Sequence, residues 1–318
     1  MRLTIKLFAK KARNTPVLVF IFVVLLFSMF LGSRFLNVLS LTNIARQISI
    51  DVPIALGQAV VLISGGIDIS VGSVMAMAAV ISVAVPGLNV PLAIILALSF
   101  GAFVGLINGL LVTKAKIVPF IATLGTMSAV RGLVLVTTGQ RAIMSSHPNF
   151  AFLGGGSIWL IPFPFIVSLL LLIAITTFLQ KTRSGRNFFA IGGDLDNAYL
   201  AGIPIFRTRV LPFVISGTLA SLAGVLLASR LESANPQIGM DTALASIAAA
   251  IIGGASMLGG RGSAFGAFLG VAILGILSTG MNLLGVTTYY QIGIKSAVFI
   301  SVVVVDAAMI KYGKKRRR

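Results

Sequence analysis

Cysteine is absent from this sequence, and charged residues are scarce. The lack of cysteine excludes disulfides, thiolate metal sites and cysteine catalysis. Charged residues make up 10% of the 318 residues, whereas hydrophobic residues make up 57% and the mean hydropathy is +1.06. A soluble globular chain carries about 25% charged residues. This sequence has too few of them to cover a water-facing surface, which indicates a membrane protein.

Acidic residues are rarer than basic ones. Seven aspartates and glutamates stand against 25 lysines and arginines, for a net charge of +18. In a soluble protein this balance would suggest nucleic-acid binding. Here the basic residues form short clusters between apolar runs, as the positive-inside rule describes. We therefore expect contact with membrane lipid and no nucleic-acid partner.

Motifs for catalysis are also lacking. The sole histidine, His147, lies in a polar loop, so no serine–histidine pair is in register for an intramembrane enzyme. The nucleotide-binding motif G-x-x-x-x-G-K-[ST] does not occur. The sequence predicts no enzyme activity, no cofactor and no metal site, so any energy from ATP must come through another protein.

Apolar runs of about the length that crosses a bilayer recur along the chain. They predict an all-α, polytopic transmembrane helix bundle of about ten spans, with 1–318 as a single transmembrane domain. The expected spans are 16–33, 44–64, 70–86, 91–113, 117–137, 160–179, 210–229, 243–259, 263–281 and 290–310. The third and eighth are short and contain glycine, so the alternative is eight crossings with both of these re-entrant.

The basic residues indicate how the spans are oriented. With ten spans and a cytosolic N-terminus, most of the 25 basic residues fall in cytosolic segments. These segments include the basic N-terminus (1–15), the connection 180–209 and the basic tail (311–318). Both termini are therefore predicted to be cytosolic. The first apolar run has no A-x-A cleavage site after it, which favours a retained span over a signal peptide.

The connection 180–209 is the longest between predicted spans. Its middle contains a short helix-like segment, Leu195–Ala201, with Asp194 or Asp196 as the N-cap and Gly202 after its end. The apolar side of this helix has no membrane to enter at this point. We expect it to dock on another protein, and the alternative is a loop helix that lies on its own bundle.

Glycines recur at a spacing of four in two spans, at positions 101, 105 and 109 and at positions 262, 266 and 270. Residues four apart share a helix face, and glycine there lets a second backbone approach closely. The pattern predicts tight helix packing within the bundle, with a subunit interface as the alternative.

Glycine and polar residues separate the second and third spans. They are Gly65, Gly66, Asp68, Ser70 and Gly72. Unwound backbone deep in a membrane is tolerated only where protein or a water-filled cavity satisfies it, so an ionisable residue at such a break is a functional candidate. Asp68 is therefore a candidate gate residue. The alternative is a cap in which Asp68 or Ser70 accepts backbone N–H bonds where the third helix begins.

Other polar residues allow two interpretations each. Three amides in or next to the spans could hydrogen-bond a solute or another helix: Asn108, Asn282 and Gln291. Glu232 and Asp241 flank a proline turn on the predicted outer face, where they either meet a basic surface of another protein or belong to a solvated loop. Arg131 and Lys295 are expected to snorkel to the outer interface.

Several motifs occur together in one order. They are VLISGGIDISVGS at 61–73, PFIATLG at 119–125 with Arg131-Gly132, TRSGR at 182–186, AIGG at 190–193, AGI at 201–203, Gly253-Gly254, GGRG at 259–262, NLLGV at 282–286 and YYQ at 289–291. From about Phe35 to Asp306 the sequence thereby resembles the permease subunits of bacterial ABC importers for monosaccharides, of the ribose type.

The resemblance implies a ten-helix subunit in the inner (cytoplasmic) membrane that works as a pair with a second permease. It implies two further partners: an ABC ATPase with tandem nucleotide-binding domains, and a periplasmic or lipoprotein sugar-binding protein, which Glu232 and Asp241 could meet. The residues it assigns to ATPase coupling are Gly185, Arg186, Ala190, Gly192, Asn197, Ala198, Ala201, Gly202 and Ile203. In this reading, Asn108, Asn282 and Gln291 could hydrogen-bond the sugar.

One segment departs from the family's pattern. The resemblance leads us to expect acidic residues shortly before Ile247, in a string like E-L-D-A-I-A-A, but this chain has Ala243-Leu244-Ala245-Ser246, with Asp241 displaced upstream. A role of those acids in gating or subunit contact does not carry over, and the substrate could differ from ribose. The alternative class is an ion-coupled secondary solute carrier, in which Asp68 would be the only embedded acid and which normally has discontinuous helices and an inverted repeat.

Overall fold

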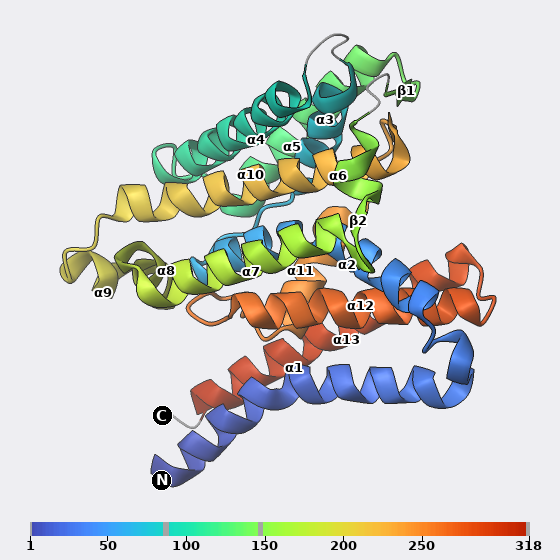
Figure 1. The fold of residues 1–318 in the computed structure, drawn as a ribbon. Helices are drawn as coiled ribbons and strands as arrows, with labels where there is room; N and C mark the ends of the chain where they lie inside the picture. Colours follow the sequence, from blue (N-terminus) through green and yellow to red (C-terminus); the bar gives the residue numbers. More distant parts are fainter. Residues whose placement is uncertain (1, 85–88, 146–148, 316–318) are drawn as a thin grey trace.

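The computed structural model describes the backbone of residues 2–84, 89–145 and 149–315, and side chains over 15–84, 89–145, 149–301 and at Val304. Figure 1 shows a bundle made almost entirely of helices. In chain order the helices are α1 (Arg2–Leu31), the 3-10 turn η1 (Gly32–Arg34), α2 (Val38–Ile63), α3 (Val71–Ala84), α4 (Val90–Thr113), α5 (Pro119–Thr138), α6 (Ala151–Gly155), α7 (Phe163–Lys181), α8 (Arg183–Gly193), α9 (Leu195–Leu200), α10 (Ile205–Leu231), α11 (Thr242–Ile252), α12 (Ala264–Leu283) and α13 (Thr288–Lys315).

Four two-residue strands complete the described structure. β1 (Ile143–Met144) pairs with β4 (Ser233–Ala234), and β2 (Ser157–Ile158) pairs with β3 (Ile161–Pro162), both antiparallel. The β1–β4 pair ties the segment after α5 to the segment after α10.

Each of the ten predicted spans falls on a helix: α1 to α5, α7, and α10 to α13. Among the described residues, seven helices are long and apolar enough to cross a membrane, namely α1, α2, α4, α5, α7, α10 and α12. α3 and α11 are apolar but only 14 and 11 residues long, as the sequence predicts for the third and eighth spans. The all-α polytopic bundle is confirmed, and ten complete crossings stay a prediction.

Several helices end at other residues than the predicted spans. The first span, predicted at 16–33, matches the apolar segment Thr15–Arg34, but the helix begins at Arg2, because the basic segment consists largely of good helix formers that continue into the apolar run. α11 ends at Ile252 rather than near residue 259. Two glycines follow it, and Gly254 has a φ of +92°, a left-handed conformation that ends a helix.

α10 is the central helix of the bundle and packs along α4, α3 and α2. The glycines spaced by four explain the closest of these contacts. A Cβ added at Gly101 of α4 would overlap the carbonyl oxygen of Gly217 on α10, and one at Gly270 of α12 would overlap that of Ala249 on α11. The tight helix packing predicted from the glycines spaced by four is therefore confirmed.

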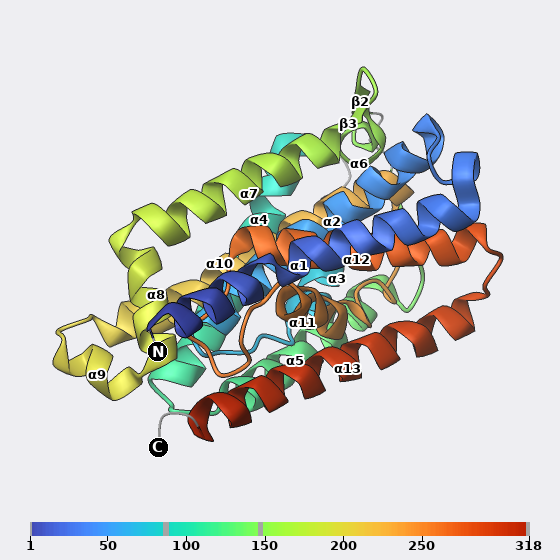
Figure 2. The same ribbon diagram turned by 90° about the horizontal axis from the view of Figure 1, so that it is seen from below.

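The two ends of the bundle carry different elements. α8 and α9 project at one end, and α1 begins and α13 ends at that same end (Figure 1). The strands and α6 lie at the other end. Seen from below, α13 runs along one edge, where it contacts α11 and α12 (Figure 2). This arrangement is the one expected for an even number of crossings.

The helix contact at Gly101 gives a test of the fold. Gly101→Ala should lower the free energy of unfolding by about 1–3 kcal/mol, because the added Cβ forces α4 and α10 apart. Gly125 on α5 is the matched control, since a Cβ there meets nothing within 4 Å. Gly125→Ala should raise stability by up to about 1 kcal/mol through helix propensity. Thermal unfolding of the purified subunit in detergent measures both, and shifts of the same sign would contradict the packing described.

Candidate functional site

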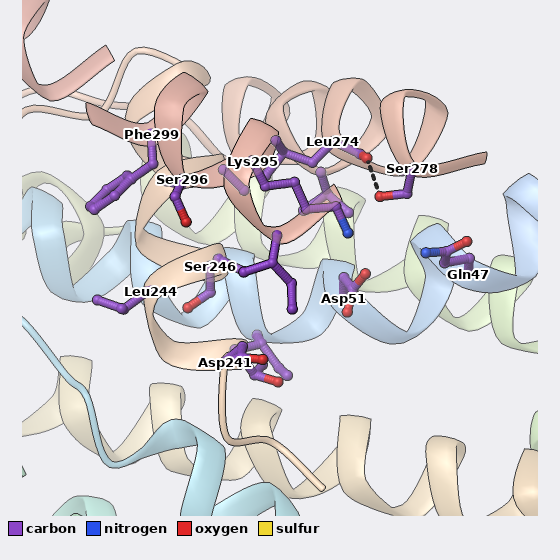
Figure 3. Close-up of a pocket in the computed structure, with 18 residues that line it drawn as sticks. Gln47, Asp51, Asp241, Leu244, Ser246, Leu274, Ser278, Lys295, Ser296 and Phe299 are labelled. Carbon is purple, nitrogen blue, oxygen red and sulfur yellow. Dashed lines mark hydrogen bonds between the residues drawn. The ribbon is translucent and has the colours of Figure 1, made fainter. Parts of the chain in front are cut away.

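A cavity of about 310 Å³ lies between α2, α11, α12 and α13 (Figure 3). Its volume is at the lower end of the range for small-molecule sites. Its wall is mostly apolar. The polar side chains that line it are those of Gln47, Asp51, Asp241, Thr242, Ser246, Ser278, Lys295 and Ser296. The wall includes the middle of α2, at Gln47, Asp51 and Ile54, and the start of α11, so the cavity extends from the middle of the bundle away from the end with α8 and α9.

Opposite charges meet across this cavity. In Figure 3 the ammonium of Lys295, on α13, points toward the carboxylate of Asp51, on α2. The two are near enough for their charges to interact. Lys295 thus lies on the cavity wall, and its snorkelling to the outer interface stays a prediction. The prediction that Asp68 is the only embedded acid is wrong. An acid inside an apolar span is itself a signal of function, and Asp51 could have been found by it.

The inner limit of the cavity is apolar. Ile54, Ala249 and Val271 line it and are all buried. At this level α11 and α12 are in backbone contact, since Gly270 lies against the carbonyl of Ala249. These residues close the cavity toward the end of the bundle that carries α8 and α9.

Asp68 lies between α2 and α3 and is completely buried. Its Oδ1 accepts hydrogen bonds from the backbone N–H of Ser70 (3.0 Å) and the hydroxyl of Ser70 (2.6 Å). Its Oδ2 accepts one from the hydroxyl of Ser216 on α10 (2.8 Å). The carboxylate thus accepts a backbone bond where α3 begins, as the cap interpretation predicts. It also ties that point to the central helix.

The network continues from Ser70 into two further helices. The Asn108 amide on α4 donates to the Ser70 hydroxyl (2.9 Å), and the Thr126 hydroxyl on α5 donates to the Asn108 Oδ1 (2.6 Å). Asn108 is fully buried and does not line the cavity. Its amide therefore connects helices by hydrogen bonds, which was the alternative to a place in the solute path. One connected set of polar side chains therefore joins α3, α4, α5 and α10.

The two other candidate amides bond to each other. The Gln291 Nε2 donates to the Asn282 Oδ1 (2.6 Å) and to the Val286 carbonyl (2.9 Å). These bonds fasten the end of α12 to the start of α13. Neither amide lines the cavity.

α8 was not predicted, and it packs on its own bundle. The Thr182 hydroxyl caps it by accepting from the Gly185 N–H (3.0 Å). Phe188 is fully buried and its ring lies 5.7 Å from that of Phe178 on α7. Gly185 is also buried, against the Phe178 carbonyl. Arg186 and Ala190, on the opposite side, are exposed. The buried positions of α8, Gly185, Phe188 and Ile191, recur every three residues, and this helical period could have located α8 in the sequence.

The end of α8 meets the end of α2. A Cβ at Gly192 would overlap the carbonyl oxygen of Ile63, the last residue of α2. The same carbonyl accepts a hydrogen bond from the N–H of Gly260 (2.9 Å), in the α11–α12 connection. Gly65, with a φ of +82°, continues the chain from this point. Three segments far apart in the sequence therefore converge on one carbonyl. The remaining glycines of the predicted gate also face neighbours, Gly66 toward a phenylalanine ring of α10 and Gly72 toward a backbone carbonyl.

α9 confirms the predicted short helix. The Asp194 Oδ1 accepts from the Asn197 N–H (2.9 Å), so Asp194 is the N-cap. Ala198 is buried, whereas Tyr199 and Leu200 are 71% and 81% exposed. Of the other positions predicted to couple, Asn197, Ala201 and Gly202 are exposed, and Ile203 is half-buried. The exposed apolar side of α9 is therefore formed by Tyr199 and Leu200 rather than by Ala198.

The outer loop after α10 holds the remaining candidates. Glu232 and Asp241 are both exposed, and Asp241 also lines the cavity. Arg131 was expected to snorkel, but its guanidinium donates to the carbonyls of Pro236 and Ile238 in this loop. Arg131 thus holds the loop against α5.

These features define a polytopic membrane protein with a solute-sized cavity in one half of its bundle and an exposed apolar helix at the opposite end. Residues 40–303 match a family model described as "Branched-chain amino acid transport system / permease component", and the chain belongs to this family of permeases. No solved structure matches it significantly.

Three relatives that match this chain over most of their length are permeases named for sugars. The chain is 42% identical over 290 residues to the ribose import permease protein RbsC of Bacillus subtilis, covering 90% of each chain. It is 34% identical to the D-allose transport system permease protein AlsC of Escherichia coli, covering 91% of this chain and 90% of the other. It is 33% identical to the L-arabinose ABC transporter permease protein AraH of Azospirillum brasilense, covering 96% and 90%.

The buried network gives a second test. Asp68→Ala should lower the free energy of unfolding by about 3 kcal/mol, because buried donors on Ser70 and Ser216 lose their acceptor. Asp194→Ala is the control, since it also removes a capping carboxylate but at an exposed site, and it should cost about 1 kcal/mol. Thermal unfolding in detergent compares the two. Equal losses of unfolding free energy in the two variants would mean that the hydrogen bonds of Asp68 contribute no more than an exposed helix cap does.

Proposed function

We propose that this chain is the transmembrane permease subunit of an ABC importer that moves a monosaccharide, ribose or a close relative, across the bacterial inner membrane. The observation that carries the proposal is 33–42% identity over about nine-tenths of the chain to permeases named for ribose, allose and arabinose. The family description names branched-chain amino acids. The individual relatives support sugar instead, and the cavity is of a size for a small polar solute.

In this proposal the protein spans the membrane ten times, with the end that carries α8, α9 and both termini in the cytosol. The start of α1, the end of α13 and the basic clusters around α8 lie at that end, as the positive-inside rule requires. The cavity then faces the outer half of the membrane. Sugar delivered by a periplasmic or lipoprotein binding protein would enter it, and the exposed side chains of Glu232 and Asp241 would meet that protein. A second permease subunit completes the path.

Coupling to the ATPase follows from the contacts of α8 and α9. Tyr199 and Leu200 present an apolar surface to a partner in the cytosol, which is the ABC ATPase with its tandem nucleotide-binding domains. α8 carries any displacement to the carbonyl of Ile63 through Gly192. α2, which ends at that carbonyl, also lines the cavity. Closure of the ATPase domains would thereby reach the solute path through one helix.

Reconstitution tests the function. The permease, its ATPase and its binding protein are placed in proteoliposomes and offered radiolabelled D-ribose, D-allose and L-arabinose. Uptake of at least one sugar should require ATP and the binding protein, and it should persist when an uncoupler collapses ion gradients. Uptake by the permease alone that needs only an ion gradient would overturn the proposal in favour of an ion-coupled carrier. Asp51 and Asp68 would then be the residues to substitute.

The coupling surface gives a further test. Leu200→Ser should weaken association with the ATPase roughly tenfold or more, since burying a leucine side chain is worth about 1.5–3 kcal/mol. Leu160→Ser is the matched control, because Leu160 is 70% exposed but lies at the opposite end of the bundle, and it should leave association unchanged. Co-purification and titration with the purified ATPase measure this. Equal binding by both variants would remove α9 from the interface.

Ala198→Arg is a less specific test of the same surface. Ala198 is buried, so arginine there would displace α9 from its own chain before reaching any partner. Gly202→Trp has a similar fault, because Gly202 has a φ of +74° that a tryptophan rarely adopts. Loss of transport in either variant would support a role for the loop but would not separate the interface from the fold.

A further inference from the structure

Gln58 on α2 is buried without partners. None of its surface is exposed, and neither its Nε2 nor its Oε1 has a hydrogen-bond partner among the described residues. Leaving such groups unpaired costs about 1–3 kcal/mol, so an unsatisfied buried amide needs an explanation. The other buried amides behave differently, since Asn108 and Gln291 are both hydrogen-bonded. A second subunit cannot supply the partner, because this chain alone already covers Gln58.

The position of Gln58 relates it to the cavity. Gln47, Asp51 and Ile54 line the cavity from α2, and Gln58 continues their spacing of four, three and four. Residues at this spacing share one face of a helix. With a rise of 1.5 Å per residue, Gln58 lies about 6 Å beyond Ile54 along the helix axis. Ile54 belongs to the apolar inner limit, so Gln58 is on the cavity face of α2 directly behind that limit.

We propose that Gln58 is an inner binding position for the transported sugar, which the sugar reaches once the apolar limit at Ile54 opens. This inference rests on the proposed function and adds a specificity-determining residue to it. A primary amide carries both a donor and an acceptor, as a hydroxyl does, and it can therefore bond neighbouring hydroxyls of a polyol. Sugar leaving the polar outer cavity would otherwise cross an apolar passage with its hydroxyls unpaired.

Because Gln58 is uncharged, it suits a position that binds the sugar weakly and releases it again. Conduction requires a site favourable enough to enter and weak enough to leave. An amide gives hydrogen bonds without charge, whereas the charged pair of Asp51 and Lys295 lies in the outer cavity. The sugar would thus move from a polar entrance to a neutral inner position.

The contact at the end of α2 links this position to the coupling helices. Gln58 precedes Ile63 by five residues, or about 7.5 Å along the helix. Gly192 of α8 and Gly260 of the α11–α12 connection both lie against the Ile63 carbonyl. A displacement of α8 would therefore move the segment of α2 that carries Gln58.

The test separates transport from stability. Gln58→Met replaces the amide with an apolar side chain of similar size. Because the amide is unpaired in the resting structure, the variant should keep or raise the thermal midpoint of the wild type. In the reconstituted complex it should keep ATP hydrolysis stimulated by the binding protein but lower uptake of labelled sugar tenfold or more, and so reduce the sugar moved per ATP.

Ser221→Ala is the matched control. The Ser221 hydroxyl is also buried without a partner among the described residues, but it faces α4 from α10, away from the cavity. This variant should likewise keep or raise the thermal midpoint, with uptake within twofold of the wild type.

Two results would overturn the inference. Uptake by Gln58→Met within twofold of the wild type would mean that the sugar does not use the amide. A lowered thermal midpoint would mean that the amide stabilises the resting fold. Both differ from a failure of the proposed function, in which the wild-type complex itself moves none of the three sugars with ATP.

Discussion

The carboxyl end of α2 must satisfy its last carbonyl groups inside the bundle, and this requirement organises the site. Ser64 donates to the carbonyls of Val60 and Val61, and Gly65 to that of Leu62. The carbonyl of Ile63 receives the N–H of Gly260. Because a buried carbonyl without a partner is costly, the Ile63 carbonyl at the end of α2 requires a donor from elsewhere in the chain. The segment with Gly260, and α8 beside it, are thereby placed against the helix that lines the cavity.

Polar side chains in this bundle serve two distinct purposes. The set from Ser216 through Asp68 and Asn108 to Thr126 is fully hydrogen-bonded and fixes four helices relative to one another. Such a network gains rigidity from each satisfied member. The polar groups on the cavity face of α2 are instead open to a cavity or unpaired. The structure thus combines a rigid polar network around α10 with a face of α2, toward the cavity, on which polar groups lack hydrogen-bond partners.

Sequence predicted the elements better than the site. Apolar runs located the ten helices on which the predicted spans fall, and capping chemistry located α9 with Asp194, because both signals are local. Asp51 and Gln58 were missed although both interrupt the predicted span 44–64, because their significance depends on α11, α12 and α13, more than 180 residues away in sequence. Asn108 was expected either in the path or between helices. The two roles are distinguished only by the Ser70 hydroxyl across the bundle, which lies 2.9 Å from the Asn108 amide nitrogen.

The departure from the family's pattern before Ile247 falls on the cavity wall. The expected string would place its two acids at positions 243 and 245. Ala245 lines the cavity, as do its neighbours Leu244 and Ser246, whereas Ala243 does not. Among the described residues, the cavity wall then has only the carboxylates of Asp51 and Asp241, with Lys295 opposite Asp51. A wall with fewer negative charges gives the single ammonium more influence on the field inside, because opposing charges in a confined site are weakly screened. The departure therefore bears on what the cavity accepts more directly than on how subunits meet.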